Sequence, residues 1–224
     1  MAQKVRMDKQ ISKTLDEFFR KFTILKYRKG EILVRSDDTP SGVMYLARGH
    51  VRQYAINQEG DMLVLHVFKP GSFFPMTWAI NNTPNAYFYE AVTPAEIFRA
   101  PREEVVAFLK VHPEILFNLT SRLLEGLSGL LARIEHLILD PAYVKTVSFL
   151  LFYAKTFAQG SKEGVAFTVP VTHRELAAWI GTTRETASLQ VEALKKKGLV
   201  HYKGRQLIIA NLALLSRELD AAES

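Results

Sequence analysis

Four residues in the C-terminal part of the chain have side chains that could contact the edges of DNA bases. They are adjacent or one helical turn apart, and they are Arg184, Glu185, Ser188 and Leu189. An arginine can donate two hydrogen bonds to guanine, and a glutamate can accept one from the amino group of cytosine. An Arg-Glu pair alone is more often found on the solvated face of an ordinary helical hairpin. The surrounding sequence must therefore show whether these residues contact DNA or only solvent.

The surrounding sequence, residues 171–200, carries the start signals of two short helices joined by a tight turn. Thr172 with Glu175, and Thr182 with Glu185, each have the T-x-x-E spacing of a capping box, which satisfies the free amides at a helix start. Gly181 lies where the chain must leave one helix and turn into the next, as in a helix-turn-helix. The expected inner faces are Leu176, Ala177 and Ile180 in the first helix and Ala187, Val191 and Leu194 in the second.

Positive charge accumulates around this unit. Seven basic residues stand against three acidic ones between positions 172 and 205; the basic ones are Arg174, Arg184, Lys195, Lys196, Lys197, Lys203 and Arg205. The stretch LVHYKGRQLII reads as two short strands around Lys203, which would form a basic wing. The combined pattern predicts a winged helix-turn-helix that binds double-stranded DNA, with Lys203 on a phosphate.

The composition favours two domains and excludes several classes of chemistry. The chain has 224 residues, 48% of them hydrophobic, a net charge of +6 and no cysteine. Disulfides, cysteine-ligated zinc and iron-sulfur clusters are therefore excluded. The start of the chain lacks the apolar core of a signal peptide, and no apolar run is long enough to span a membrane, so we expect a cytoplasmic protein with no membrane partner.

The N-terminal part, residues 1–112, reads as a β-rich domain. Residues 8–21 have the apolar spacing of an amphipathic helix, and seven short β-rich runs follow between residues 23 and 100, separated by glycine, proline and asparagine turns. Many short strands without helices between them predict an antiparallel sandwich or barrel. A short helix is expected after Pro101. The pattern contains no catalytic constellation, so we do not expect an enzyme.

A long helix is predicted for residues 113–139, with an apolar seam typical of a coiled coil. The seam alternates spacings of four and three and consists of Leu116, Thr120, Leu123, Leu127, Leu130, Ile134 and Leu137. A parallel partner helix in a homodimer is the natural inference, and a single buried helix in a monomer is the alternative. A second stripe, Phe117, Leu124, Leu131 and Ile138, is expected to pack on the barrel.

The third part, residues 140–224, begins at a predicted hinge. Asp140-Pro141 breaks the helical pattern, because the residue before proline avoids the helical region. A further apolar helix is expected to end near Gly160, followed by a polar loop, SKEG, that leads into the helix-turn-helix. The hinge would let the seam helix set the position of the DNA-binding unit.

This order of parts resembles the catabolite activator/FNR (CRP/FNR) family of bacterial transcription regulators. The motifs that carry the resemblance run over nearly the whole chain and are KGEILVRSDD, VMYLARGHVRQYAI, FKPGSFF and THRELAAWIGTTRETAS...L...GLV. The resemblance implies an α+β fold with a cyclic-nucleotide-binding-like antiparallel β-barrel (jelly roll), a homodimer and a two-fold symmetric promoter site. It also implies contact with RNA polymerase if the protein is an activator.

Residue by residue, the resemblance assigns roles within the helix-turn-helix. Arg184 and Glu185 match the base-reading pair of the family, and Thr172, Thr183 and Thr186 match positions that usually hold phosphates. The family pattern RETxSR ends in a second arginine, whereas here that position is Leu189. Leucine cannot donate to guanine but can pack on a thymine methyl, so we expect a different preference at that base, unless Leu189 contributes nothing specific.

The ligand signatures of the family are absent. Members that bind cyclic AMP carry a Gly-Glu pair after Pro-Gly and an Arg-Ser pair on a later strand, where this chain has Pro75-Met76 and Asn85-Ala86. A buried cyclic phosphate without its arginine would lose a charge-assisted partner, so cyclic AMP and cyclic GMP are not expected as ligands. His66 stands without a second axial candidate, so haem is not expected either. We therefore expect no cofactor.

An unidentified small-molecule effector could bind an aromatic-rich region of the barrel. Its candidate pocket residues are Phe73, Phe74, Met76, Trp78, Asn85, Tyr87 and Tyr89, with Phe88 in the same run. Ligand pockets are commonly apolar with a few polar anchors, but such a cluster is more often core packing. Two alternatives stay open: a DNA binder that needs no effector, and a nucleotide-sensing module whose C-terminal unit is a protein adaptor.

Overall fold

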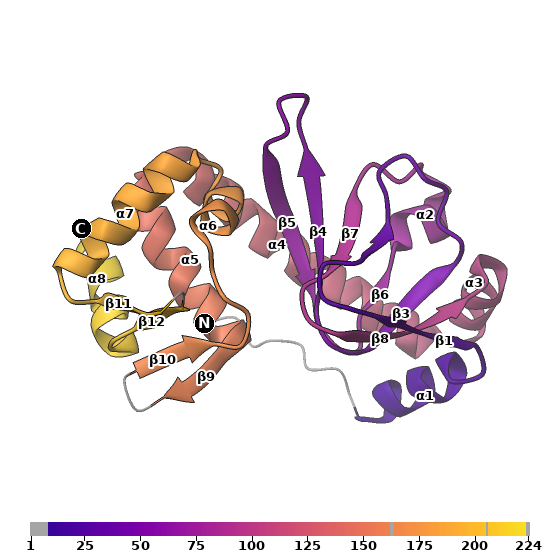
Figure 1. The fold of residues 1–224 in the computed structure, drawn as a ribbon. Helices are drawn as coiled ribbons and strands as arrows, with labels where there is room; N and C mark the ends of the chain where they lie inside the picture. Colours follow the sequence, from indigo (N-terminus) through magenta and orange to yellow (C-terminus); the bar gives the residue numbers. More distant parts are fainter. Residues whose placement is uncertain (1–8, 162–163, 205, 223–224) are drawn as a thin grey trace. The chain divides into compact units, whose positions relative to one another are not determined.

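The short β-rich runs of the N-terminal half form two four-stranded sheets in the computed structural model, which describes residues 9–161, 164–204 and 206–222 (Figure 1). One sheet has the strand order β1-β8-β3-β6 and the other β2-β7-β4-β5. The resolved pairings are antiparallel, which confirms the expected jelly-roll type of β-barrel. The strands are β1 (Thr23–Tyr27), β2 (Ile32–Val34), β3 (Val43–Arg48), β4 (Val51–Ile56), β5 (Met62–Phe68), β6 (Phe73–Phe74), β7 (Phe88–Ala91) and β8 (Ala95–Ala100).

Strand β3 separates two apolar cores. Met44 and Leu46 lie in the core between the two sheets, together with residues of β2, β4, β6, β7 and β8. Val43 and Tyr45 lie in a second core, on the other face of the same sheet. Because successive side chains of a strand point to opposite faces, burial on both faces requires the unbroken apolar run that the sequence shows here.

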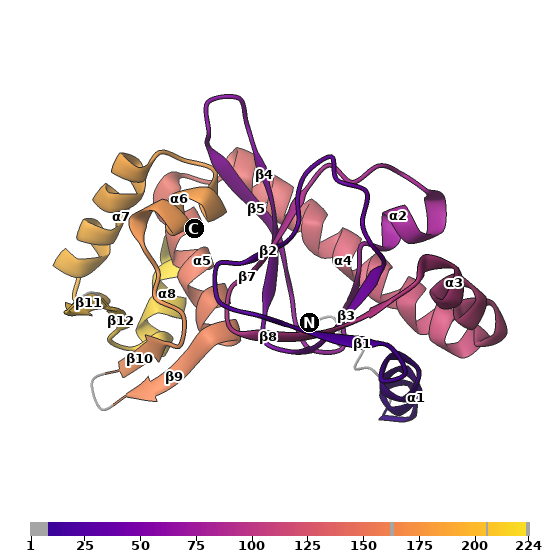
Figure 2. The ribbon, with the colours of Figure 1, turned by 45° about the vertical axis from the view of Figure 1, so that its right-hand side comes forward.

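Helices cover the second core (Figure 2). They are α1 (Lys9–Phe19), α2 (Met76–Asn81), α3 (Arg102–Val111) and the first turns of α4 (Pro113–Leu139). The ring of Phe19 stacks on Tyr45 with centroids 4.6 Å apart and nearly parallel planes. The predicted helices are confirmed, whereas β6 and α2 were not expected, because Pro75 interrupts the pattern between them.

The apolar stripes of α4 are exposed, which corrects one expectation. Ile115 and Leu119 are the residues of α4 that are buried in the second core. The second stripe, expected to pack on the barrel, is solvent-exposed instead, with Phe117 75% and Ile138 72% accessible. The stripe lies on a different side of the helix from Ile115 and Leu119, because residues of one face recur every three or four positions. The seam residues Leu116, Leu123, Leu127, Leu130 and Ile134 are exposed as well, and Leu137 is half-buried.

The C-terminal half packs three helices and a small sheet around α5. The elements are α5 (Ala142–Phe157), β9 (Ala158–Ser161), β10 (Gly164–Phe167), α6 (His173–Ile180), α7 (Arg184–Lys196), β11 (Val200–Lys203), β12 (Gln206–Ile209) and α8 (Leu212–Ala222). The sheet has the order β11-β12-β10-β9. One face of α5, including Val147 and Leu150, is fully buried, and it contacts α6, α7 and α8. This arrangement holds α6 and α7 on a common apolar base.

The segment after α5 differs from its expected form. The polar loop SKEG was expected to lead through FTVPV into the helix-turn-helix, with no strand before it. Instead, β9 and β10 pair as an antiparallel hairpin with Ala158 opposite Phe167. The polar residues 162 and 163 between the two strands lie outside the described residues. The sequence AQGS has weak strand propensity, so its pairing with β10 stabilises a strand that local composition does not predict.

The chain divides into two compact units, and the division falls inside α4. The first unit takes the chain up to Asn57 and from Val64 to Leu130, and the second takes Gln58–Leu63 and everything from Leu131 onward. The predicted helix break at Asp140-Pro141 is present, since α4 ends at Leu139 and α5 begins at Ala142. Both sides of that break belong to the same compact unit, so a hinge at Asp140-Pro141 stays a prediction.

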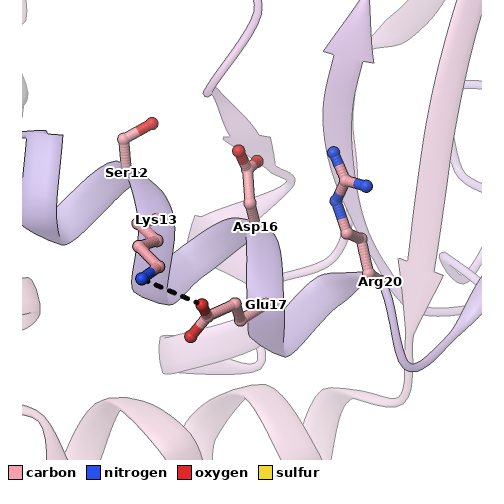
Figure 3. Close-up of a pocket in the computed structure, with 5 residues that line it drawn as sticks. All are labelled: Ser12, Lys13, Asp16, Glu17 and Arg20. Atoms are coloured by element: carbon pink, nitrogen blue, oxygen red, sulfur yellow. Dashed lines mark ion pairs between the residues drawn. The ribbon is translucent and has the colours of Figure 1, made fainter.

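A buried hydrogen bond links α1 to the first sheet. The Tyr45 hydroxyl, on a side chain only 2% exposed, donates to Asp16 Oδ1 at 2.6 Å. Burial and the neighbouring carboxylate raise the pKa of Tyr45 above its ordinary value. On the same helix, Glu17 pairs with Lys13 in solvent at 3.8 Å, within a shallow groove lined by α1 (Figure 3). Asp16 also lines this groove, but its partner is the hydroxyl of a buried tyrosine, whereas the partner of Glu17 is an exposed ammonium group.

This difference predicts unequal effects of two neighbouring substitutions. Asp16→Ala removes the acceptor of a buried hydroxyl and should lower the free energy of unfolding by about 2 kcal/mol. Glu17→Ala removes an exposed ion pair and should change it by less than about 0.5 kcal/mol. Urea unfolding of the two variants, followed by circular dichroism, measures both values. Equal losses would show that the Tyr45–Asp16 bond contributes no more to the free energy of unfolding than the exposed ion pair.

Candidate nucleic-acid interface

A capping box starts α6, as predicted. The amide of Glu175 donates to Thr172 Oγ1 at 3.1 Å, and the amide of Thr172 donates to Glu175 Oε2 at 2.9 Å. Thr172 has extended backbone angles, whereas the next residue is already helical. The two reciprocal bonds satisfy amides that have no partner within the helix, and they fix where α6 begins.

The turn between α6 and α7 depends on the backbone of Gly181. This residue has φ 62° and ψ 48°, the left-handed region that glycine adopts at low cost. Its amide and the amide of Thr182 both reach back to the carbonyl of Ala177, which closes the end of α6. A β-carbon on Gly181 would meet its nearest neighbour, Leu137, at an ordinary 3.7 Å. The conformation, rather than the space, therefore favours glycine here.

The start of α7 corrects the second predicted capping box. The N-cap residue is Thr183, not Thr182, and its hydroxyl accepts a hydrogen bond from the amide of Thr186 at 3.2 Å. Thr182 is used in the turn that closes α6, so α7 starts one residue later than the T-x-x-E spacing indicates. Glu185 lies in the first turn of α7, where a carboxylate faces the positive end of the helix dipole.

The two helices meet through the predicted inner faces. Leu176 and Ile180 of α6, and Val191 and Leu194 of α7, are each at most 3% exposed. With these faces buried, the opposite side of α7 is left in solvent. Arg184, Glu185 and Leu189 are exposed there, and Ser188 is half-buried. Leu189 is 68% exposed, and such exposure of a leucine has no packing explanation within the described chain.

Some of the basic residues of this unit pair with an acidic side chain. Arg174, Arg184, Lys196 and Lys203 are exposed, whereas Arg205 lies outside the described residues. Lys195 lies 3.4 Å from Glu192 on the same helix. The remaining lysine, Lys197, belongs to a network described next, so the positive charge on the outer side of α7 is smaller than the sequence count indicates.

Lys197 is held by the last helix. Its ammonium pairs with Glu218 of α8 and lies 4.8 Å from the ring centroid of Tyr143, whose hydroxyl donates to Glu218 at 2.7 Å. Hydrogen bonds from Lys197 and then from Tyr143 lower the pKa of the Glu218 carboxyl. The network fastens the C-terminal end of α7 to α5 and α8. Lys197 therefore acts as a structural anchor in this arrangement.

The predicted wing is present and is tied to α6. Strands β11 and β12 pair with Lys203 opposite Gln206, around Gly204 with φ 60°. The ring of His173, the first residue of α6, makes a 2.8 Å hydrogen bond with the hydroxyl of Tyr202 on β11. The sequence analysis did not predict this bond, since the two residues are 29 positions apart. It fixes the wing beside the first turn of α6.

The candidate phosphate-binding residues occupy helix starts or the wing. Thr172 and Thr183 are N-cap residues, and Thr186 shares a 3.0 Å hydrogen bond between hydroxyls with Thr183. Hydroxyls at helix starts lie beside backbone amides and the positive dipole end, which is where phosphate groups are commonly bound. Lys203 is exposed at the tip of the wing.

The candidate effector-pocket residues lie in separate environments. Phe73 belongs to the helix-covered core, which Met76 and Trp78 also contact, whereas Phe74 and Tyr89 stack on each other in the sandwich core with centroids 5.2 Å apart. Phe73 and Phe74 are consecutive in β6, so they point to opposite faces of the sheet. These side chains therefore pack in two cores rather than around one common space.

Asn85 and Tyr87 lie in the loop just before β7. The Asn85 amide group donates to the carbonyls of Arg35 and Tyr87 at 2.7 and 2.8 Å, and the amide of Tyr87 donates to its side-chain oxygen at 3.3 Å. The Asn85 side chain is 7% exposed and ties two loops together, whereas Tyr87 is 39% exposed. The donors of Asn85 are thus used within the protein.

In the described ranges, none of the helices combines the length and apolar character of a membrane span. Those residues also contain no group of three or more histidine, aspartate or glutamate side chains that could hold a metal ion.

Two family models match the chain. The model of the cyclic nucleotide-binding domain matches residues 24–112, and the model of the Crp-like helix-turn-helix domain matches residues 144–218. Transcriptional regulator SdrP of Thermus thermophilus is 31% identical over 152 residues, which are 68% of this chain and 71% of that protein. A global nitrogen regulator of Synechocystis sp. is 26% identical over 187 residues, 81% of each protein. A crystal structure of a CRP/FNR-family regulator from Thermus thermophilus has a TM-score of 0.76 at 27% identity and covers 90% of this chain and 99% of that one.

The fold and the site therefore define a transcription regulator with a winged helix-turn-helix DNA-binding domain. The chain belongs to the CRP/FNR family, as its motifs indicated. The relatives named above are regulators and not enzymes, which agrees with the lack of a catalytic motif in the sequence.

The corrected helix start can be tested with two adjacent threonines. Thr183→Ala removes the N-cap acceptor of α7 and should lower the free energy of unfolding by about 1 kcal/mol. Thr182→Ala should change it by less than about 0.5 kcal/mol, because its side chain does not cap the helix. Thermal unfolding of both variants measures the difference. A larger loss for Thr182→Ala would restore the capping box that the sequence predicted.

Proposed function

We propose that the protein is a homodimer that reads a two-fold symmetric promoter site with one α7 helix from each protomer. The exposure of Arg184, Glu185 and Leu189 at the start of the second helix of a helix-turn-helix carries this proposal. In that motif, the N-terminal residues of the second helix lie against base edges in the major groove. Arg184 and Glu185 supply donors and an acceptor, and Leu189 supplies an apolar surface for a thymine methyl.

The exposed face of α4 supports the dimer. Large apolar residues of the seam and the second stripe lie in solvent along more than six helical turns, from Leu116 to Leu139. A soluble chain rarely exposes so long a contiguous apolar surface unless another molecule covers it. A second α4 presents the same stripe in the same register, and a parallel pair brings two DNA-reading units to one side.

The β-barrel is the proposed sensor, and its ligand is a small molecule other than a cyclic nucleotide. Asn85 stands where cyclic-AMP-binding members have arginine, and its amide is bonded to two carbonyls of the protein itself. Two carbonyl oxygens around this point present negative rather than positive charge to a phosphate. The protein acts on RNA polymerase if it is an activator. A DNA binder without any effector is the second candidate, favoured by the packing of Phe73, Phe74 and Tyr89 in the cores.

Two variants separate base reading from phosphate binding. Arg184→Ala should cost about 1 to 3 kcal/mol of binding to sites selected from random DNA and should relax the preference at one base pair. Lys203→Ala should weaken binding to all sequences alike and reduce the slope of affinity against salt. Fluorescence anisotropy at two salt concentrations measures both effects. Full affinity and unchanged preference in Arg184→Ala would refute base reading by α7.

The dimer has its own test in the seam. Leu130→Glu places a charge in the middle of the apolar face and should convert the dimer to monomers at micromolar concentration, because two glutamates would be buried opposite each other. Sedimentation equilibrium measures the mass. Ala132→Glu, at an exposed position on the same helix outside both apolar stripes, is the matched control and should leave the dimer intact. A Leu130→Glu variant that remains dimeric would exclude the seam as the interface.

A further inference from the structure

Arg133 of α4 contacts the last turn of α6. Its Nη2 atom donates to the carbonyl oxygen of Trp179 at 2.9 Å, and its guanidinium carbon lies 5.1 Å from the centroid of the Trp179 ring. Trp179 is the penultimate residue of α6, immediately before Ile180 and the turn at Gly181. The last carbonyls of a helix have no partner within it, and a cation there also faces the negative end of the helix dipole. The Arg133 side chain thus donates a hydrogen bond to the backbone of Trp179 and also contacts its ring.

The Trp179 ring also contacts α5. The ring centroids of Phe149 and Phe152 lie 5.5 and 5.4 Å from that of Trp179. The indole therefore contacts a guanidinium on α4 and two phenyl rings on α5. Burial lowers the pKa of the Arg133 guanidinium below its ordinary value. A buried guanidinium that stacks on an indole is held in one geometry more strictly than an exposed one.

One further bond crosses the helix break between α4 and α5, and a second lies at the end of α4. Lys145 Nζ donates to the carbonyl of Leu137 at 2.7 Å, and His136 Nδ1 lies 2.7 Å from Asp140 Oδ2. The last turns of α4 therefore belong to the unit that contains the helix-turn-helix, in agreement with the division after Leu130. Both sides of the break at Asp140-Pro141 lie in this unit.

The same last turns carry seam residues. Ile134 follows Arg133 directly, and the two side chains point about 100° apart around the helix axis. In the proposed dimer, Ile134 and Leu137 face the partner helix while Arg133 faces α6. The contacts run from the partner through α4 and Arg133 to Trp179, and then through the turn at Gly181 to the reading residues of α7.

We propose that Arg133 is a positioning residue for DNA reading: by holding Trp179, it fixes the orientation of α6 and α7 relative to the seam helix. The inference rests on the proposed function. Two recognition helices must be separated by about one turn of DNA, roughly 34 Å, to reach both half-sites. Without the Arg133 contact, the distance between the two recognition helices would vary over a wider range. Loss of Arg133 would therefore lower the affinity for the best spacing and leave the contacts within each half-site intact.

The experiment uses the full chain and pairs of a half-site selected from random DNA. The centre-to-centre spacing varies from about 8 to about 13 base pairs, which brackets one helical turn. The variants are Arg133→Ala, Arg133→Lys and, as the matched control, Glu135→Ala, an exposed acidic residue two positions away. Fluorescence anisotropy gives the Kd at each spacing, on an isolated half-site and on unrelated DNA.

The wild-type chain and Glu135→Ala should show one sharp optimum. Arg133→Ala should bind the optimal spacing about tenfold more weakly and show a broader profile, while its Kd for an isolated half-site and for unrelated DNA stays unchanged. Arg133→Lys keeps the charge but lacks the planar fork, so it should lie between the two. This rescue also covers the case in which Arg133→Ala does not fold.

Two results would overturn the inference. An Arg133→Ala profile as sharp as that of the wild type would show that Arg133 does not position α7. Equal weakening at every spacing and on isolated half-sites would show a role in stability alone. If the wild-type chain has no spacing optimum and Arg184→Ala keeps its base preference, the proposed function fails, and this inference fails with it. A sharp wild-type optimum that survives Arg133→Ala removes only the inference.

Discussion

The structure depends on how α4 distributes one helix surface among several neighbours. Ile115 and Leu119 bury one narrow row in the core of the first unit, and Arg122 extends that row by donating to the carbonyl of Gly71 at 3.4 Å. Arg133, eleven residues after Arg122, lies on the same side after about three turns and holds α6. The wide apolar stripe of α4 stays exposed, and a soluble protein rarely exposes such a surface unless another molecule covers it. The stripe is exposed because only a narrow row of α4 is buried within the chain.

In the helix-turn-helix and its wing, a few polar bonds fix the position of the surface that we propose to bind DNA. The apolar base of this unit includes Leu150, Leu176 and Val191, which are fully buried, and α5, α6 and α7 contact one another there. The ends of α6 and α7 are set by the Thr172 and Thr183 caps and by the left-handed Gly181. The Lys197–Glu218 pair and the His173–Tyr202 bond then fix the far end of α7 and the wing. Side chains left outside this scheme, Arg184 and Leu189 among them, have no structural task within the described chain.

Local pattern predicted most of this fold, and it failed where the outcome depends on distant partners. The strands, the long helix and the inner faces of α6 and α7 follow from periodicity, because each needs only an apolar face of known spacing. The N-cap of α7 was predicted wrongly as Thr182, because two consecutive threonines precede the helix. Only the geometry of the turn selects Thr183. Composition grouped Phe73 with Phe74, although alternation puts them in different cores. The contact between Arg133 and Trp179 spans 46 residues, and no local signal marks it.

The middle of α4 contains two glycines that packing within the described chain does not require. Gly126 and Gly129 lie just before the division between the two units, and a β-carbon on either would meet nothing within 4 Å in the described chain. Close packing within the chain therefore does not explain them, and each lowers helix stability by roughly 1 kcal/mol relative to alanine. Downstream, Arg133 and Lys145 bind α4 to α6 and α5. In the described chain, these bonds from Arg133 and Lys145 hold the end of α4, past both glycines, to the helices of the second unit.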